Sequence, residues 1–278
     1  MNKRKLIVAI VFYSLSTLLV LIWMAPFIIS VFTSLKPMDE VMLELRWWYP
    51  PKHPTLENYA IAWREANMKR YFVNTLIITG ISVVGALFVS SLSAFALSWY
   101  DFKLSRPILI MFVAGMLIPF QMLLIPVYRL SIKLGIYDTY WGVILLHIAF
   151  QTGFCTFFLR NFMVTIPKSI FEAAKIDGAG DFLIYRKVIM PLVLPALAAL
   201  GILEFTWIWN DYLWSLVLIQ SDHLKPVTLG LTTLQGQWVT SWNVIAAGAN
   251  LAALVPIVVF LFFQRYFIEG LTIGSVKG

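Results

Sequence analysis

The chain has 278 residues, a net charge of +7 and a hydrophobic content of 60%, with 13% charged residues. Soluble domains are about 45–50% apolar and about 25% charged, so this composition excludes an ordinary soluble domain and indicates an integral membrane protein. Basic residues beside apolar segments are typical of contact with anionic lipid, and no nucleic-acid binding is expected. The single cysteine, Cys155, and three scattered histidines predict neither an internal disulfide nor a metal site.

Six apolar segments reach the length of about 20 residues that a helix needs to cross a bilayer. The first has no charge from Leu6 to Leu35, which is too long for the apolar part of a secretory signal peptide. We therefore predict an all-α integral membrane protein with a single membrane domain (1–278), in which five core spans (71–264) follow an N-terminal span. The predicted spans are 8–34, 74–98, 108–128, 140–163, 194–219 and 246–264.

Six spans place both ends of the chain on the same side of the membrane. If the ends face the cytoplasm, twelve of the 21 Lys and Arg residues fall on the inner side, which is the direction of the positive-inside rule. We expect a multi-pass protein of the cell membrane with both termini in the cytoplasm. Residues 36–70 and 220–245 would then be outer connections, and residues 165–193 an inner one.

The inner connection is charged and helix-prone although apolar spans flank it. Residues 172–175 (EAAK) favour a helix, and Ser169 with Glu172 has the spacing of a capping box. Gly178 is expected to end this helix, because glycine accepts the left-handed backbone common at helix C-termini. A second helix can begin at Asp181 and feed the next span. The segment is thus predicted to form a helix-turn-helix outside the bilayer.

The order Glu-Ala-Ala at 172–174, Gly178, and Val-x-Met-Pro at 188–191 is similar to the EAA signature of ABC importer permeases. Valine and methionine replace isoleucine and leucine there. In that family the segment is a coupling helix that sits in a cleft of a separate ATP-binding subunit, whereas the plainer alternative is a solvated loop. The resemblance implies the type I ABC importer permease fold. The residues it assigns to ATPase coupling are Glu172, Ala173, Ala174, Asp177, Gly178 and Pro191.

The last nine residues, GLTIGSVKG, are similar to the ending of carbohydrate permeases of the maltose-transporter type. Serine replaces the alanine of that pattern at residue 275, and the resemblance runs from about residue 26 to the C-terminus. In that family the tail reaches into the ATP-binding dimer. The residues that this resemblance assigns to a second ATPase contact are Thr272, Gly274, Lys277 and Gly278.

No phosphate loop, nucleophile elbow or His-Glu-x-x-His motif is present, so the sequence predicts no enzyme and no cofactor bound by this chain. The resemblance implies that ATP and Mg²⁺ are bound by two partner ATP-binding subunits. It also implies a homologous second permease and an extracellular or periplasmic solute-binding protein. The chain would couple ATP hydrolysis to the import of a sugar or oligosaccharide by alternating access.

Polar side chains within spans are costly and usually face a cavity or the helix bundle. A sugar suits polar groups beside aromatic rings, but the same groups suit hydrogen bonds between helices or an interfacial aromatic belt. Glycerol-3-phosphate or a polyol derivative remains open as the substrate, and so does a secondary transporter that works alone. The candidate pathway residues are Gln121, Glu204, Trp207, Asn210, Asp211 and Tyr212.

Overall fold

The computed structural model describes residues 3–43, 48–64, 67–234 and 241–272, and all regular structure in these ranges is helical. The predicted all-α fold is therefore confirmed. The chain divides into two compact units, one of Met1–Lys69 with Gly230–Ala253 and the other of Arg70–Leu229 with Leu254–Gly278. Long helices are the expected outcome of the apolar runs, because in lipid a segment must satisfy its backbone hydrogen bonds internally.

Within the described ranges, five helical stretches are long and apolar enough to cross a membrane, and a bent pair of helices could provide a sixth crossing. The long helices are α1 (Lys3–Ser34), α4 (Met68–Trp99), α7 (Tyr140–Met163), α10 (Met190–Trp209) and α13 (Trp242–Thr272). The shorter ones are α2 (Met38–Leu43), α3 (Glu57–Arg64), α8 (Lys168–Ile176), α9 (Asp181–Ile184), the π-helical η2 (Tyr185–Ile189), α11 (Leu213–Leu218), η3 (Asp222–Leu224), α12 (Val227–Gly230) and η4 (Leu231–Leu234).

The predicted third span, 108–128, is broken rather than continuous. α5 (Ser105–Met116) and the stretch Phe120–Lys133, which comprises η1 (Phe120–Leu123) and α6 (Leu124–Lys133), are bent by 95° from one another. Pro119 lies in the break with φ −58° and ψ 116°, outside the helical region. Proline disfavours a helical residue before it and donates no backbone hydrogen bond, which explains why the helix stops there.

The predicted fifth span, 194–219, ends earlier than expected, because α10 ends at Trp209, while the continuous helical stretch already begins at Asp181. The side chain of Asp211 accepts hydrogen bonds from the backbone N–H groups of Trp214 (3.3 Å) and Ser215 (3.0 Å). These bonds satisfy donors that a new helix start leaves free, so α11 begins here as a separate helix. The fourth span, by contrast, runs from Tyr140 to Met163 as predicted.

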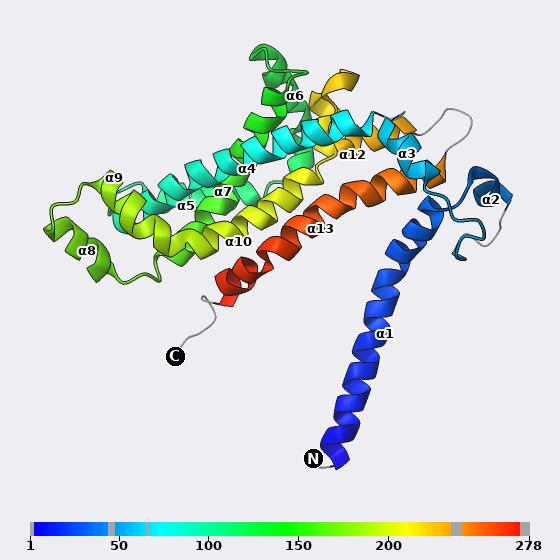
Figure 1. The fold of residues 1–278 in the computed structure, drawn as a ribbon. Helices are drawn as coiled ribbons and strands as arrows, with labels where there is room; N and C mark the ends of the chain where they lie inside the picture. Colours follow the sequence, from blue (N-terminus) through cyan, green and yellow to red (C-terminus); the bar gives the residue numbers. More distant parts are fainter. Residues whose placement is uncertain (1–2, 44–47, 65–66, 235–240, 273–278) are drawn as a thin grey trace. The chain divides into compact units, whose positions relative to one another are not determined.

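Two hydrophobic clusters hold the unit Arg70–Leu229 together. The first joins the second half of α4 to the second half of α7, to the start of α10 and to α8, η2 and the end of α9. The second joins the first half of α4 to the start of α7, the end of α10 and α11. α4 and α7 therefore run in the same direction and α10 runs opposite to them. Figure 1 shows α8 and α9 at one end of this group of helices.

Buried amides organise the other unit, where three segments meet. Asn58 on α3 donates from Nδ2 to the backbone oxygens of Ser34 (2.9 Å) and Lys36 (2.8 Å), just after α1 ends. Asn243 on α13 donates to Asn58 Oδ1 at 2.9 Å. The last carbonyls of a helix lack partners within the helix, so these amides supply hydrogen bonds that fix where α1 ends.

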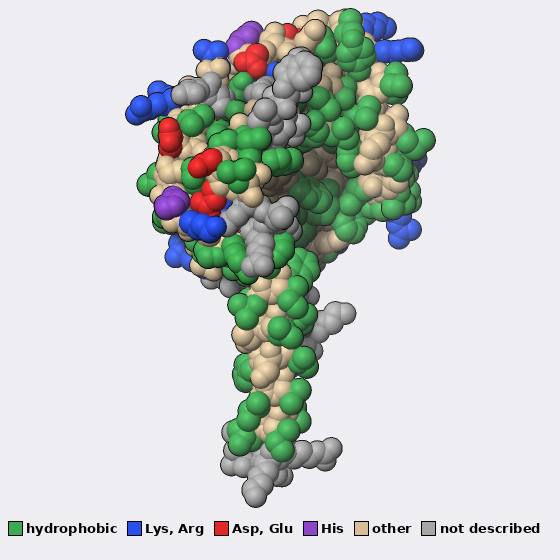
Figure 2. Space-filling model, turned by 90° about the vertical axis from the view of Figure 1, so that its right-hand side faces the viewer, with side chains coloured by type: hydrophobic (Ala, Val, Ile, Leu, Met, Phe, Trp, Pro, Cys, Tyr) green, Lys and Arg blue, Asp and Glu red, His purple; other side chains and the backbone are tan. Residues whose placement is uncertain are grey.

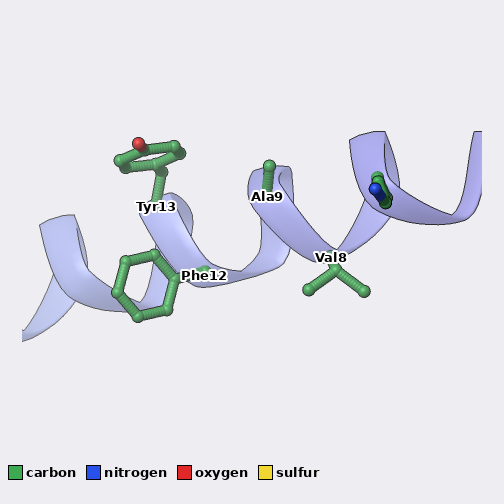
Figure 3. A pocket seen from close by; sticks show the side chains of 5 residues that line it. Val8, Ala9, Phe12 and Tyr13 are labelled. Carbon is green, nitrogen blue, oxygen red and sulfur yellow. The ribbon is translucent and has the colours of Figure 1, made fainter. Parts of the chain in front are cut away.

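The surface of α1 is apolar along its length, as Figure 2 shows for the hydrophobic side chains on this helix. A depression on it is lined by Lys5, Val8, Ala9, Phe12 and Tyr13. Figure 3 shows that the labelled side chains all come from neighbouring turns of one helix. The depression is therefore a shallow gap between turns rather than an enclosed ligand site, and its mainly apolar lining suits contact with lipid.

Gly142 is required by a close backbone contact at the start of α7. A Cβ atom there would lie 2.5 Å from the backbone oxygen of Ile136, whereas at Gly153 of the same helix it would meet only ordinary contacts of 3.5 Å or more. We expect Gly142→Ala to destabilise the fold by about 1–3 kcal/mol, the usual cost of overpacking, and Gly153→Ala to be tolerated. Thermal unfolding of the two detergent-solubilised variants checks this, and equal midpoints would contradict it.

Candidate functional site

The predicted coupling segment contains α8, which begins at Lys168 with Pro167 at its N-cap position and without a side-chain cap. The predicted capping box at Ser169 is therefore wrong, because the helix has already started before that residue. Pro167 provides the start instead: its φ of −56° suits the entry into a helix, and a proline there removes no intrahelical hydrogen bond.

The end of α8 was predicted at Gly178, and the structure confirms it. Gly178 has φ +80°; its N–H donates to Lys175 O at 3.0 Å, and the N–H of Ala179 donates to Ala174 O at 3.0 Å. This pair of bonds is the Schellman motif. A Cβ at Gly178 would meet no atom within 4 Å, so the left-handed backbone, and not a lack of space, calls for glycine.

One side of α8 is buried through Phe171, its one buried residue. The Phe171 ring stacks on Trp99 with centroids 4.9 Å apart and planes at 12°. It also meets Tyr100 edge-on at 6.1 Å and Phe95 at 6.1 Å. These rings, together with Tyr185, form an aromatic cluster at the C-terminal end of α4, which we call the aromatic cradle.

The opposite side of α8 is open. Ile176 is 85% exposed, and Phe182 at the start of α9 is 68% exposed. Of the predicted coupling residues, Ala174 is half-buried and the rest are exposed, namely Glu172, Ala173, Asp177, Gly178 and Pro191.

Lys175 closes the turn between α8 and α9. Its Nζ lies 2.9 Å from Asp181 Oδ1. It also lies over two rings, 5.5 Å from the centroid of Tyr100 and 5.4 Å from that of Phe171. Burial and the neighbouring Asp181 carboxylate raise the pKa of Tyr100 to about 12, so this phenol stays neutral. The cradle is therefore capped by a cation that contacts its rings.

Pro191 follows the point where α9 passes through η2 into α10. A proline cannot donate the α-helical hydrogen bond to the residue four positions earlier, here Lys187. Lys187, whose carbonyl therefore lacks this partner, lies within the wider π-helical turn Tyr185–Ile189. The second helix starts at Asp181 as predicted, but the π-helical turn was not expected from the sequence.

The C-terminal tail can be followed only to Thr272, where α13 ends. Gly274, Lys277 and Gly278 lie outside the described residues. The proposed second ATPase contact thus stays a prediction.

The candidate pathway residues do not form one group. Gln121 is exposed in η1, whereas Glu204 is fully buried and its Oε1 accepts a hydrogen bond from Cys155 Sγ at 3.3 Å. Cys155 lies on α7 and Glu204 on α10. This contact has the form of the interhelical bond that the sequence left open as the alternative for Glu204.

The residues around the end of α10 divide between surface and interior. Trp207 is 54% exposed and Tyr212 40%, and Asn210 is also exposed. Asp211 points inward, where its Oδ2 lies 3.7 Å from His147 Nε2 of α7. The sequence did not indicate the partners Cys155 and His147, because the register between α7 and α10 cannot be read from either helix alone. The assignment of a pathway stays a prediction.

The family comparison applies to most of the chain. Residues 82–272 match the family described as "Binding-protein-dependent transport system inner membrane component". The chain belongs to this family. The resemblance to ABC importer permeases that the EAA segment carries is thereby confirmed, and the chain is a multi-pass membrane permease.

Named relatives are permeases. The osmoprotective compounds uptake permease GgtD of Synechocystis sp. is 35% identical, with 92% of this chain and 88% of the relative covered. The arabinooligosaccharides transport system permease AraQ of Halalkalibacterium halodurans is 34% identical, covering 91% of each. The alpha-glucoside transport system permease AglG of Rhizobium meliloti is 39% identical over 82% of this chain and 62% of the relative.

A solved bacterial ABC transporter for import of the acidic polysaccharide alginate contains a chain with the same fold. The TM-score is 0.85 at 24% identity, with 96% of this permease and 99% of that chain covered. The predicted type I importer permease fold is therefore confirmed.

A hydrogen-bond network at the N-terminal ends of α4 and α7 fixes the segment that follows α11 in this permease. Asn74 Nδ2 on α4 donates to the backbone oxygens of His223 (2.9 Å) and Lys225 (2.8 Å). Asp138 Oδ1, just before α7, accepts from the N–H groups of Gln220 and Ser221 at 2.9 Å each. The segment is thus held by two helices at once.

Asp138 makes this network dependent on pH. Burial acts to raise the pKa of its carboxyl, but the hydrogen bonds from Ser221 and Gln220 outweigh burial and hold the pKa below its ordinary value of 3.8. A lowered pKa means that the folded state prefers the carboxylate. The stabilisation is therefore complete above the pKa of the unfolded chain and disappears as the pH falls through the folded pKa.

We expect Asp138→Asn to lower the thermal midpoint at about pH 6 and to lose this deficit below about pH 4. Asparagine tolerates the left-handed backbone of this position, where φ is 55°, so the effect reports the loss of the carboxylate and of its hydrogen bond with the Ser221 hydroxyl. Unfolding of wild type and variant across this pH range is the measurement. A deficit that grows toward low pH would contradict the sign.

Proposed function

We propose that this permease imports a carbohydrate and that α8 is its coupling helix, with Glu172, Ala173, Ala174, Asp177, Gly178 and Pro191 as the coupling residues. The observation that carries this proposal is the two-sided construction of α8. Its outer side, with Ile176, is exposed, while its inner side is held against α4 through Phe171. A helix fixed on one side and open on the other suits the transfer of movement from a soluble motor.

The relatives support a carbohydrate as the substrate. Those named above for arabinooligosaccharides and alpha-glucosides are joined by the melibiose/raffinose/stachyose import permease MelC of Bacillus subtilis, which is 33% identical over 91% of each chain. Family membership argues against the alternative of a transporter that works alone. The alternative cargo is a polyol or glycerol-3-phosphate, and the experiment below distinguishes it from a sugar.

The partners follow from the same proposal. Two ATP-binding subunits would hold ATP and Mg²⁺, and their clefts would receive α8 and the tail residues Thr272, Gly274, Lys277 and Gly278. A homologous second permease would complete the membrane part, and an extracellular or periplasmic solute-binding protein would deliver the substrate. Both termini would lie in the cytoplasm, since α8 must face the motor.

Purification of the tagged chain from native membranes, followed by mass spectrometry, tests this assembly. We expect an ATP-binding subunit and a second related permease to be recovered with it. The ligand bound to a co-purifying solute-binding protein would identify the cargo as a sugar or a polyol. A chain that purifies alone and transports after reconstitution would overturn the proposal.

Gly178 and Gly180 offer a matched pair for the coupling role. Gly178 has φ +80° and Gly180 has φ −70°, and neither has an atom that would obstruct a Cβ. Alanine costs about 1–2 kcal/mol in the left-handed conformation, so Gly178→Ala should loosen the end of α8 while Gly180→Ala should not. In the purified complex, we expect Gly178→Ala, but not Gly180→Ala, to lower transport per ATP hydrolysed. Glu172→Lys on the exposed side of α8 should lower it as well. Equal behaviour of the two glycine variants would contradict this role.

A further inference from the structure

The segment from α8 to η2 contacts α4 along one stripe of that helix, through Phe171 of α8 and Tyr185 of η2. We propose that α8 and the C-terminal part of α4 move as one body, so that Phe171, Lys175 and Tyr185 are positioning residues that carry the motor's stroke into α4. This inference rests on the proposed coupling function. It adds a second route for the stroke, because the chain itself connects α8 only to α7 and α10.

The residues of α4 that receive the coupling segment share a single face. Ser91, Phe95 and Trp99 are spaced by four residues each and therefore lie above one another on an α-helix. Eight residues correspond to about 12 Å along the axis. A contact spread over this length resists tilting as well as sliding, which a single contact point would not.

The first attachment is the stack of Phe171 on Trp99, extended by Phe95 and Tyr100. Aromatic pairs prefer stacked or edge-on geometry, and both kinds occur here, so the ring of Phe171 is fixed in orientation as well as in place. Lys175, one turn later on α8, lies over two of these rings and pairs with Asp181. The pair is largely exposed, so its part is to hold the turn and not to supply most of the stability.

The second attachment is a buried hydrogen bond between the hydroxyls of Tyr185 and Ser91, with the oxygens 2.7 Å apart. Ser91 has one hydroxyl proton and gives it to the backbone oxygen of Phe88 at 2.8 Å. Tyr185 is therefore the donor to Ser91. Because Tyr185 opens the π-helical turn η2, this bond ties the segment between α9 and α10 to α4 as well.

Spin labels can show whether α8 and α4 move together. Lys168→Cys at the start of α8 and Val84→Cys on α4 are suitable sites, since both side chains are exposed and neither is a proposed coupling residue, and the native Cys155 is buried. The distance between the labels would be measured by pulsed electron resonance in the complete complex, without nucleotide and after trapping with ATP and vanadate. The inference expects the same distance distribution in both states.

Phe171→Ala should break this rigid connection. In the trapped state, some molecules keep the wild-type label distance and others show a changed one. The ratio of the first group to the second is expected to fall by about three- to tenfold, the factor that the loss of an aromatic pair represents. Phe171→Tyr keeps the ring and should retain the wild-type distribution. Tyr185→Phe removes only the hydroxyl that bonds to Ser91, so it gives a second test if Phe171→Ala does not fold, and it should broaden the distribution in the same way.

Two results would overturn the inference: a label distance that changes on trapping in the unmodified cradle, or an unchanged distribution in both Phe171→Ala and Tyr185→Phe. Failure of the proposed coupling function itself would look different. In that case no ATP-binding subunit would be recovered with the chain, and ATP with vanadate would trap nothing.

Discussion

The absence of water in the bilayer core is the constraint on which this structure depends. A chain that crosses hydrocarbon must bond its backbone within each helix, and charged side chains are expensive there. The basic and acidic residues of the EAA segment accordingly lie between α7 and the apolar run of α10. A soluble partner that binds this segment would meet the helices at that end.

Rigid transmission from such a point requires that the attached helix cannot bend or slide. α8 has only nine residues, and its two ends are fixed by backbone chemistry: a proline before it and a Schellman turn after it. Neither device needs a partner subunit. The helix is therefore formed before any motor binds, and the ordering cost that a flexible loop would carry on binding is already met within the chain.

Much of this could be predicted from local sequence signals. The span 140–163 was predicted from its apolar run, and the structure adds that the side chain of Thr139 caps its start. Gly178 marks the end of α8, because glycine accepts the left-handed backbone that this position has. The bend at Pro119 and the early end of α10 were missed, although Pro119 and Asp211 are the residues that cause them. Hydropathy averages over such positions, whereas a single proline or a capping carboxylate decides where a helix stops.

The contacts between helices were beyond the reach of the sequence. Cys155 with Glu204 and Ser91 with Tyr185 depend on the register between helices, which no single segment encodes. The contacts of α4 could not be predicted either, because its sequence indicates only an ordinary apolar span. Its C-terminal end holds the cradle and its N-terminal end holds the segment after α11 through Asn74. At about 1.5 Å per residue, this helix of 32 residues is about 48 Å long. One continuous helix thus joins the EAA segment to the opposite end of the unit, and a displacement of the cradle cannot leave that end unaffected unless α4 itself bends.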